Sequence, residues 1–457
     1  MLLFKFDFLP NEVVEFSCSR QLKVGNYQFL TIMSNLEVFK FGGASVCDID
    51  GIKNVATIIT SYSDKNLIIV VSAMGKTTDA LEDIVKSYFG NTNAQELLNV
   101  VKQKHFETAS QLLKNPTDTL KSLNDLFVEI EWILEDEPHD AYDYIYDQIV
   151  SLGELLSTRI VADYLHEIGL NAEWFDARDV VKTDETWREA RVNWQNTELA
   201  ISKSLLPKLN TQTSTIVVTQ GFIGSTKDNN TTTLGREGSD FSAAIFSHFV
   251  HPQHMTIWKD VDGVYSGDPR IFKNVEKLPH ISFDEAIEMT YFGATVVHPR
   301  TIQPLKQKNV PLVVRSFFKK GVEGTQIGNH EKSISYPPIF TIERHQTFIR
   351  VLNKDASFLV EQHIALLFQI FAKHFIFVNL LQNSGSYFYV AITHIDEKHA
   401  ALLADLEEHY TIECFEGYDL FTIRHFTESA IQSVIAGKKI AFEKSFGDTF
   451  QVLLAKG

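Results

Sequence analysis

A run of apolar residues, Leu67-Ile68-Ile69-Val70-Val71, limits what this chain can fold into more than any other feature. The run has the length of a strand and lacks the alternation of apolar and polar residues that marks a strand with one wet face. A continuous apolar strand is expected in a parallel sheet that helices cover on both faces. The run therefore predicts an α/β fold with a buried parallel sheet.

Strand-like and helical patterns alternate from Val38 to about residue 330. Strand-like segments lie at 38–41, 172–175, 214–219, 255–258 and 311–316, and helical patterns fill 94–114, 118–136, 141–168 and 239–249. Strands that alternate with helices predict parallel β-α-β units packed as an α/β sandwich. We expect this domain to occupy residues 36–330, after an extension, residues 1–35, that carries no recognisable motif.

The C-terminal part, residues 331–457, follows a different pattern. Its polar start, which includes Pro337-Pro338, is interpreted as a linker. The predicted order after the linker is strand 341–351, helix 361–374, strands 375–381 and 386–393, helix 398–408, and strands 411–414 and 420–423. This β-α-β-β-α-β order is typical of a ferredoxin-like unit. A second, truncated unit is expected at 419–456, without a final helix.

Composition excludes several classes of function. The 457 residues leave room for two to four domains at roughly 100–200 residues each. The formal net charge of −16 argues against a nucleic-acid-binding surface, which needs clustered Lys and Arg. The cysteines Cys18, Cys47 and Cys414 are too sparse to indicate a disulfide framework or a zinc site, and they fit a reducing cytoplasm. No apolar run approaches the roughly 18 residues of a membrane helix. We expect a cytoplasmic protein that binds neither nucleic acid nor membrane.

The segment Lys40-Phe41-Gly42-Gly43 lies at the end of the first predicted strand. Two glycines let backbone N–H groups approach a ligand oxygen, and a lysine beside them supplies a positive charge for phosphate. Ligands bind α/β sheets at the ends of strands. The alternative is an ordinary Gly-Gly turn with an exposed lysine, and the motif alone favours that alternative.

A second segment, Thr231–Asp240, places glycines, hydroxyls, an arginine and a carboxylate just before a predicted helix. A helix N-terminus attracts anions through its free N–H groups and its dipole. Arg236 has the geometry to hold a carboxylate through two hydrogen bonds. The alternative is that Ser239 or Asp240 simply caps the helix, which leaves the arginine between two glycines unexplained.

Two further segments are less informative alone. Gly153 lies inside a helical pattern, where it costs about 1 kcal/mol relative to alanine, so we expect a close approach there with Glu154 facing a ligand. The alternative for Glu154 is a solvated surface side chain. The segment Trp258–Arg270 follows a strand, and a turn-rich loop is an equally good interpretation of it.

Taken in order, these segments resemble the aspartate kinases of the amino-acid kinase superfamily. The matching segments are 40–46, 71–78, 153–157, 174–178, 219–224, 231–240, 258–270, 292–294 and 298–299. Together they span Val38 to about residue 330, and their shared order is far more specific than any one motif. The resemblance implies a three-layer α/β/α kinase domain followed by an α+β ferredoxin-like regulatory region of the ACT type.

The resemblance also implies a role for each matching position. Lys40 resembles the catalytic lysine that neutralises the transferring phosphoryl group, and Asp240 resembles the catalytic aspartate. The positions that resemble contacts to the amino-acid substrate are Thr77, Glu154, Arg236 and Ser239. The positions that resemble the nucleotide site are Lys40, Phe41, Gly42, Gly43, Lys259, Asp260, Tyr265, Arg270, Thr295 and Val296.

The implied activity is ATP-dependent phosphorylation of the side-chain carboxylate of L-aspartate to 4-phospho-L-aspartate, which begins lysine, threonine and methionine synthesis. A carboxylate is ionised at pH 7 and needs no general base. Catalysis is then mainly positioning and charge neutralisation by Lys, N–H groups and Mg²⁺, which is expected to be held through the nucleotide phosphates. The resemblance further implies an amino-acid effector at the ACT region and a homodimer.

Two alternatives stay open. The nearest is another member of the superfamily, such as a glutamate 5-kinase, an acetylglutamate kinase or a UMP kinase. The other is a catalytically dead amino-acid sensor, against which the intact residues Lys40, Arg236 and Asp240 argue. The chain also departs from its relatives, because Glu237 stands where they often have glycine, and Glu361-Gln362-His363 stands where the first ACT loop usually has one.

Overall fold

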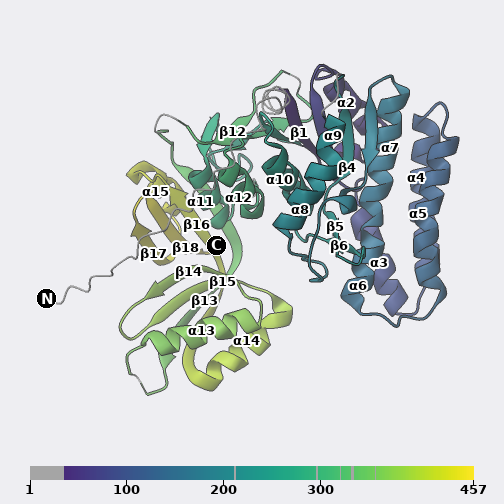
Figure 1. The fold of residues 1–457 in the computed structure, drawn as a ribbon. Coiled ribbons are helices and arrows are strands. Elements are labelled where there is room, and N and C mark those ends of the chain that lie inside the picture. Colours follow the sequence, from purple (N-terminus) through teal and green to yellow (C-terminus); the bar gives the residue numbers. More distant parts are fainter. Residues whose placement is uncertain are drawn as a thin grey trace, which may run out of the picture.

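The computed structural model describes residues 35–209, 213–294, 297–319, 321–330, 334–355 and 357–456. The expected extension, residues 1–35, lies outside the described residues apart from Asn35. Within the described part, an eight-stranded sheet packed between helices is followed by a six-stranded sheet with its own helices (Figure 1). The prediction of an α/β region followed by an α+β region is confirmed.

The large sheet is built around its first strand. From edge to edge its strands are β10 (His280–Ser282), β12 (Thr325–Gly328), β11 (Leu312–Ser316), β7 (Met255–Lys259), β1 (Leu36–Phe41), β2 (Asn66–Val71), β4 (Ile216–Gln220) and β3 (Ala172–Phe175). β1 lies between β2 and β7 and is parallel to both. The chain first builds outward on the β2 side and later crosses to the β7 side. Ligands bind α/β sheets at the carboxyl ends of strands where the order reverses in this way.

The side chains of β2 show why its apolar run is continuous. Leu67, Ile69 and Val71 belong to the hydrophobic core on one face of the sheet, and Ile68 and Val70 belong to the core on the other face. All five are fully buried. Because successive side chains of a strand point to opposite faces, a strand between two cores has no position for a polar residue. The predicted burial on both faces is confirmed.

Helices supply the partners of both cores. The first core receives side chains from α2 (Ile49–Thr60), α3 (Thr77–Phe89), α4 (Ala94–Leu112), α5 (Thr117–Glu135), α6 (Tyr142–Val150) and α7 (Leu152–Glu167). The second core receives them from α8 (Trp194–Ala200), α9 (Leu206–Leu209), α10 (Gly238–Val250), α11 (Phe283–Tyr291) and α12 (Pro299–Lys308). The helix predicted over 141–168 is divided into α6 and α7. Ser151, which separates them, keeps right-handed helical angles (φ −59°, ψ −22°), so the division is a local irregularity in one helical run.

The C-terminal region forms the second sheet. Its strands in order are β14 (Val378–Asn383), β15 (Phe388–Thr393), β13 (Ile339–Asn353), β16 (Tyr410–Arg424), β18 (Thr449–Ala455) and β17 (Ile440–Phe446), with helices α13 (Glu361–Lys373), α14 (Asp396–His409) and α15 (Glu428–Ile435). Each pair of neighbouring strands in this sheet is antiparallel.

The prediction of two separate strands at 411–414 and 420–423 is wrong, because both belong to β16. β13 and β16 pair along their whole lengths, with register shifts between Glu343 and Phe348. Gly417, which lies between the two predicted segments, has a φ of +81° and interrupts the strand pattern in the sequence without ending the ladder. Among the described helices, none is long and apolar enough to cross a membrane.

Candidate active site

A cavity of about 380 Å³ opens at the carboxyl ends of β1 and β2, beside the first turn of α10. It is lined by Lys40, Gly43, Ser72, Ala73, Gly75, Thr78, Glu154, Phe222, Gly235, Glu237, Gly238, Ser239, Asp240 and Lys259. These residues come from six separate segments of the first domain. The cavity therefore lies where the reversal of strand order predicts a ligand site.

One end of the cavity holds a carboxylate between two lysines. Asp240 Oδ1 lies 2.6 Å from Lys40 Nζ, and Asp240 Oδ2 lies 3.8 Å from Lys259 Nζ. Burial acts to raise the pKa of Asp240, but the charges of Lys40 and Lys259 outweigh it and hold the pKa below its usual value. Two ammonium groups and one carboxylate leave a net charge of +1 for an anionic ligand.

The contact of Asp240 with the two lysines decides between the alternative interpretations of the segments 40–43 and 231–240. The Lys40 side chain is 12% exposed and paired, so the ordinary turn with an exposed lysine is wrong. The N-cap of α10 is Glu237, whose side chain makes no capping hydrogen bond to that helix end. Asp240 therefore lies in the first turn of α10 as the partner of two lysines and not as a cap.

The glycines at the end of β1 allow a close approach of backbone to backbone. A Cβ on Gly43 would lie 2.6 Å from the carbonyl oxygen of Ala73, and the Gly43 carbonyl accepts a hydrogen bond of 2.9 Å from the Gly75 N–H. A side chain at residue 43 would push the loops after β1 and β2 apart. At Gly42 a Cβ would have room, with Lys40 Nζ its nearest neighbour at 3.6 Å.

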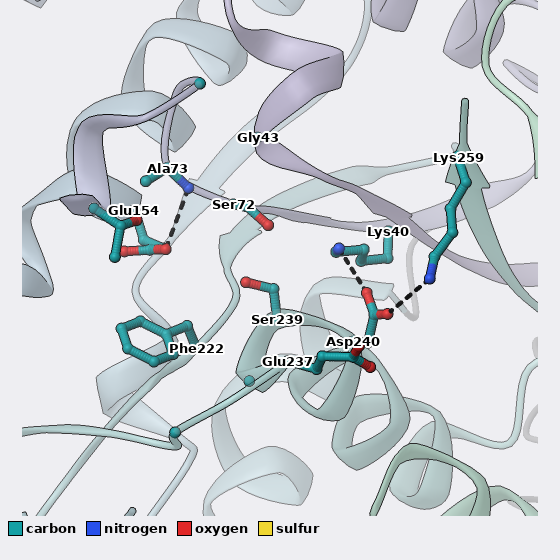
Figure 2. A pocket seen from close by; sticks show the side chains of 14 residues that line it. Lys40, Gly43, Ser72, Ala73, Glu154, Phe222, Glu237, Ser239, Asp240 and Lys259 are labelled. Carbon is teal, nitrogen blue, oxygen red and sulfur yellow. Dashed lines mark hydrogen bonds and ion pairs between the residues drawn. The ribbon is translucent and has the colours of Figure 1, made fainter. Parts of the chain in front are cut away.

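Glu154 lies at the other end of the cavity (Figure 2). Its Oε1 accepts a hydrogen bond of 3.2 Å from the Ala73 N–H, and its buried Oε2 has no hydrogen-bond partner among the described residues. Burial raises the pKa of Glu154 to about 8, despite the opposing effects of the Ala73 N–H and the charge of Lys40. The alternative of a solvated surface glutamate is wrong. The predicted close approach is confirmed, since a Cβ on Gly153 would lie 2.8 Å from the Ala73 Cβ.

Ser239 lies between the two ends, as Figure 2 shows. Its position depends on Gly221 after β4, because a Cβ there would lie 2.5 Å from the Ser239 Cβ. The next residue, Phe222, lines the cavity, and its N–H donates to Ser242 Oγ at 2.8 Å. The loop after β4 and the first turns of α10 therefore fit together as one unit.

Two of the expected substrate contacts, Thr77 and Arg236, are not among the residues that line the cavity. Thr77 is buried and its hydroxyl donates to the Met74 carbonyl at 2.7 Å, while its neighbour Thr78 lines the cavity. Arg236 is exposed and is not part of the cavity wall, although Gly235 and Glu237 on either side of it are. Their proposed contacts with substrate require the side chain of Arg236 to turn inward and the Thr77 hydroxyl to exchange its partner.

The expected nucleotide residues are spread over a wider area. Lys259 lines the cavity, whereas Asp260 is exposed outside it. Tyr265 donates its hydroxyl to Asp262 at 3.0 Å, and Arg270 pairs with Asp268 through two nitrogens, Nε and Nη2, within the same loop.

The remaining expected nucleotide contacts are Phe41, Thr295 and Val296. The Phe41 side chain is fully buried and stacks on the Trp258 ring at 6.1 Å, so only its backbone can reach a ligand. Thr295 and Val296 lie outside the described residues.

Sequence reasoning missed Asp147, which supports the segment that carries Ser239 and Asp240. This buried carboxylate accepts hydrogen bonds from the Thr233 hydroxyl at 2.6 Å, from the Thr233 N–H at 3.0 Å and from the Arg188 N–H at 3.1 Å. Burial raises its pKa to about 6, against the effect of those hydrogen bonds. Its sequence neighbourhood carries no motif, because its partners lie 41 and 86 residues away.

Glu237 also has a conformation that explains its unusual place. Its φ of 53° and ψ of 27° are left-handed angles that glycine adopts without strain. The carboxylate accepts a hydrogen bond of 3.2 Å from the His298 N–H and lies on the cavity wall. A glycine would fit this backbone better, and the glutamate adds a negative charge to the cavity.

Comparisons with known proteins agree with this geometry. Residues 35–316 match the model of the amino acid kinase family. The chain is 33% identical to lysine-sensitive aspartokinase 3 of Escherichia coli (strain K12), over 77% of each chain. It is 38% identical to a chloroplastic bifunctional aspartokinase/homoserine dehydrogenase 1 of Arabidopsis thaliana, over 64% of this chain and only 32% of that relative.

Solved structures give the same result. E. coli aspartokinase III in complex with lysine and aspartate (T-state) is 28% identical, with a TM-score of 0.77 over 92% of this chain and 96% of that chain. The same enzyme in complex with aspartate and ADP (R-state) is 27% identical, with a TM-score of 0.76 over the same shares.

Proposed function

The chain belongs to the amino acid kinase family and, within it, to the aspartokinases, and from this premise we propose that it transfers the γ-phosphoryl group of ATP to the side-chain carboxylate of L-aspartate. The products are ADP and 4-phospho-L-aspartate, so the reaction is the first step of the aspartate pathway. One observation carries the proposal. A single cavity holds a lysine-rich end and a buried glutamate end with a serine between them.

In the proposed reaction, the lysine end receives the phosphates. Lys40 and Lys259 face the γ-phosphoryl group, and Asp240 holds the two ammonium groups in place. An aspartate carboxylate oxygen forms a bond to the γ-phosphorus while the bond from that phosphorus to the β–γ bridging oxygen breaks. Both reactants are anions, so the lysines act by reducing their repulsion and by stabilising the charge that spreads over the equatorial oxygens.

The glutamate end receives the amino acid. The free Oε2 of Glu154 is a buried acceptor for the α-ammonium group of aspartate, which also supplies the positive charge that a buried carboxylate lacks. The Ser239 hydroxyl lies between this end and the lysines, where the side-chain carboxylate must pass. Arg236, turned inward from its exposed position, holds the α-carboxylate.

Mg²⁺ enters this scheme through the nucleotide. Both oxygens of Asp240 face lysines. Among the described residues, no group of three His, Cys, Asp or Glu side chains close enough to hold a metal ion lies at this cavity. Phosphate oxygens are therefore its main ligands, and bound Mg²⁺ would add positive charge at the β- and γ-phosphates. The residues present fit a metal that arrives as the ATP complex.

A coupled ADP-release assay tests the reaction. We expect turnover with L-aspartate to exceed turnover with L-glutamate, N-acetyl-L-glutamate and UMP, and we expect Lys40→Ala to lower it at least about a hundredfold, as loss of a charge at a phosphoryl site does. Lys86→Ala, an exposed position on α3, is the matched control and should keep full activity. Equal turnover with aspartate and glutamate, or an active Lys40→Ala chain with a native circular dichroism spectrum, contradicts the proposal.

We also propose that the C-terminal region binds an amino-acid effector and pairs two chains. The effector is supported by the E. coli relative, which was solved with lysine. Pairing is supported by Phe375 and Phe377, which are 79% and 84% exposed next to the edge strand β14. The assay repeated with lysine, threonine and both together tests the effector, and a Phe377→Lys chain that sediments as the wild type does argues against this face as the interface.

We further propose a cytoplasmic location, supported by the free thiols of Cys47 and Cys414.

A further inference from the structure

A cluster of nitrogen, sulfur and oxygen donors lies in the C-terminal region, between α14 and β16. His394 follows β15, His399 lies in the first turns of α14, and Cys414 and Glu416 lie on β16. One donor atom from each of His394, His399 and Glu416 lies within 4.8 Å of the other two. The proposed kinase reaction uses none of these residues.

Local structure explains why these side chains meet. Cys414 and Glu416 are two residues apart on a strand, so their side chains leave the same face of the sheet. Helix α14 packs on that face, which brings His399 over the strand. His394 lies in the short connection from β15 to α14, and its ring centroid is 4.4 Å from that of His399.

The distances fit ligands of one tetrahedral ion. His399 Nε2 lies 3.1 Å from Glu416 Oε1 and 3.9 Å from Cys414 Sγ. In a tetrahedral zinc site, metal–ligand distances of about 2.1 Å for N or O and about 2.3 Å for S place the ligand atoms roughly 3.4–3.7 Å apart. The donor atoms of His394, His399 and Glu416 lie near this spacing, and Cys414, outside their 4.8 Å group, approaches them through His399.

A neighbouring hydroxyl orients one of the imidazoles. Thr347 Oγ1 lies 2.8 Å from His394 Nδ1, which leaves Nε2 of that ring for the cluster. A second hydrogen bond of this kind is the usual support of a metal-binding histidine. Asp396, whose side chain is 96% exposed, lies 2.9 Å from His394 Nε2 and is free to turn into solvent. Hydrogen bonds to carboxylates account for each histidine singly, but not for the approach of both imidazoles to Glu416 with a thiol beside His399.

We propose that His394, His399, Cys414 and Glu416 bind one Zn²⁺ ion or a similar transition-metal ion. Mixed N, S and O ligands suit Zn²⁺, whereas Mg²⁺ and Ca²⁺ prefer oxygen alone. The ion joins α14 to β16 in the regulatory region, away from the kinase cavity. No sequence motif marks the site, because its ligands come from three separate segments.

Cobalt is the probe that tests this site, because tetrahedral Co²⁺ is coloured and Zn²⁺ is not. We expect the full chain, stripped with a chelator and kept free of nucleotide, to bind one Co²⁺ with strong visible bands and a near-ultraviolet thiolate-to-cobalt band. Addition of Zn²⁺ should remove both signals. A wild-type chain that binds Co²⁺ only in the weak, pale form typical of water-coordinated ions overturns the proposal.

Variants then assign the ligands. His394→Asn with His399→Asn should weaken Co²⁺ binding at least a hundredfold, and Cys414→Ser should remove the near-ultraviolet band. The matched control is His280→Gln with His330→Gln, since those rings lie 5.2 Å apart and, among the described residues, no further His, Cys, Asp or Glu joins them in a group of three. Glu416→Gln, at a side chain that is 58% exposed, weakens binding without a risk to folding. Unchanged Co²⁺ binding in the His394→Asn, His399→Asn double variant or in Glu416→Gln, or a retained near-ultraviolet band in Cys414→Ser, overturns the assignment.

Discussion

Two buried carboxylates share one cavity and have opposite protonation behaviour. Asp240 has lysines on both sides, and their charges lower its pKa although burial acts in the other direction. Glu154 has one N–H donor and a distant lysine, so burial dominates and raises its pKa to about 8. The environment thus keeps Asp240 ionised and keeps Glu154 neutral until a positive group arrives.

The pKa of Glu154 predicts how aspartate binding depends on pH. An ammonium group requires the ionised form, so binding releases a proton when the empty site is protonated. We expect the dissociation constant of aspartate to fall as pH rises from about 6 to 8, by at most about tenfold per unit, and to level off above 8. Isothermal titration calorimetry measures it. In Glu154→Gln, aspartate should bind weakly, with a dissociation constant that does not change over this pH range. A wild-type dissociation constant that is independent of pH contradicts the prediction.

Glu237 carries a second prediction at this scale. Its carboxylate faces the cavity that receives the phosphates, so its removal should strengthen nucleotide binding. Glu237→Gln keeps the side chain's shape and should lower the KM for ATP about fivefold, which corresponds to about 1 kcal/mol, the upper end for a pair of solvent-exposed charges. Glu135→Gln, at the exposed end of α5, is the control. A KM that rises in Glu237→Gln shows that the carboxylate serves binding and does not hinder it.

At the scale of elements, the cavity depends on how closely the loop after β4 meets the first turn of α10. That contact has no room for a side chain at Gly221, whose Cβ would lie 2.5 Å from the Ser239 Cβ. Asp147 on α6 fixes the same region from the other side by holding Thr233. Rigid elements, and not the loops themselves, therefore set the positions of Ser239 and Asp240.

A substitution at Gly221 tests this dependence. Gly221→Ala should displace the start of α10 and lower kcat/KM for aspartate by about a hundredfold, since small displacements of positioned groups have effects of that size. Gly328→Ala on β12 is the matched control, because its nearest neighbour would be an ordinary 3.7 Å contact with Pro311. Equal activity of the two variants contradicts a positioning role for this contact.

At the scale of the whole molecule, a buried ion pair joins the domain of the eight-stranded sheet to the domain of the six-stranded sheet. Arg424 at the end of β16 donates to both oxygens of Glu285 on α11, at 2.7 and 2.8 Å. Burial raises the pKa of Glu285, but hydrogen bonds from Arg424 and His425 outweigh it and bring the pKa to about 2. β16 also carries Cys414 and Glu416, so one strand runs from the proposed metal site to the kinase domain.

This pair predicts a loss of stability in acid. The pKa of Glu285 is lower in the folded chain than its usual 4.5, so its contribution is complete above pH 4.5 and is lost as pH falls toward 2. The contribution is on the order of 3 kcal/mol, because the pKa falls from 4.5 to about 2 and a fall of one corresponds to about 1.36 kcal/mol. Urea unfolding at pH 7, 5 and 3.5 should show a smaller dependence on pH in Glu285→Gln than in the wild type.

The matched control for Glu285 is an exposed pair. Glu413→Gln breaks the contact with Arg350, where both side chains are at least a third exposed, and such surface pairs contribute at most about 1 kcal/mol. If Glu413→Gln changes the pH dependence of unfolding as much as Glu285→Gln does, the Arg424–Glu285 pair contributes no more to the pH-dependent free energy of unfolding than a surface pair does.

The sequence by itself determined the features that depend on neighbours along the chain. The run Leu67–Val71 predicted a strand between two cores because alternate side chains of any strand face opposite ways. Gly153 inside a helical pattern predicted a close approach, which the structure contains. The order of segments predicted the family, because one reaction needs these groups in one cavity.

Only the tertiary structure decided what depends on distance in space. Burial gave Glu154 its raised pKa, and two lysines from different strands made Asp240 an ion-pair partner instead of a cap. Asp147 and the Arg424–Glu285 pair left no trace in local sequence, since their partners lie far along the chain. Desolvation and Coulomb interactions act through space, so the protonation and pairing of these groups follow from the packing of the sheets and helices and not from their neighbours in the chain.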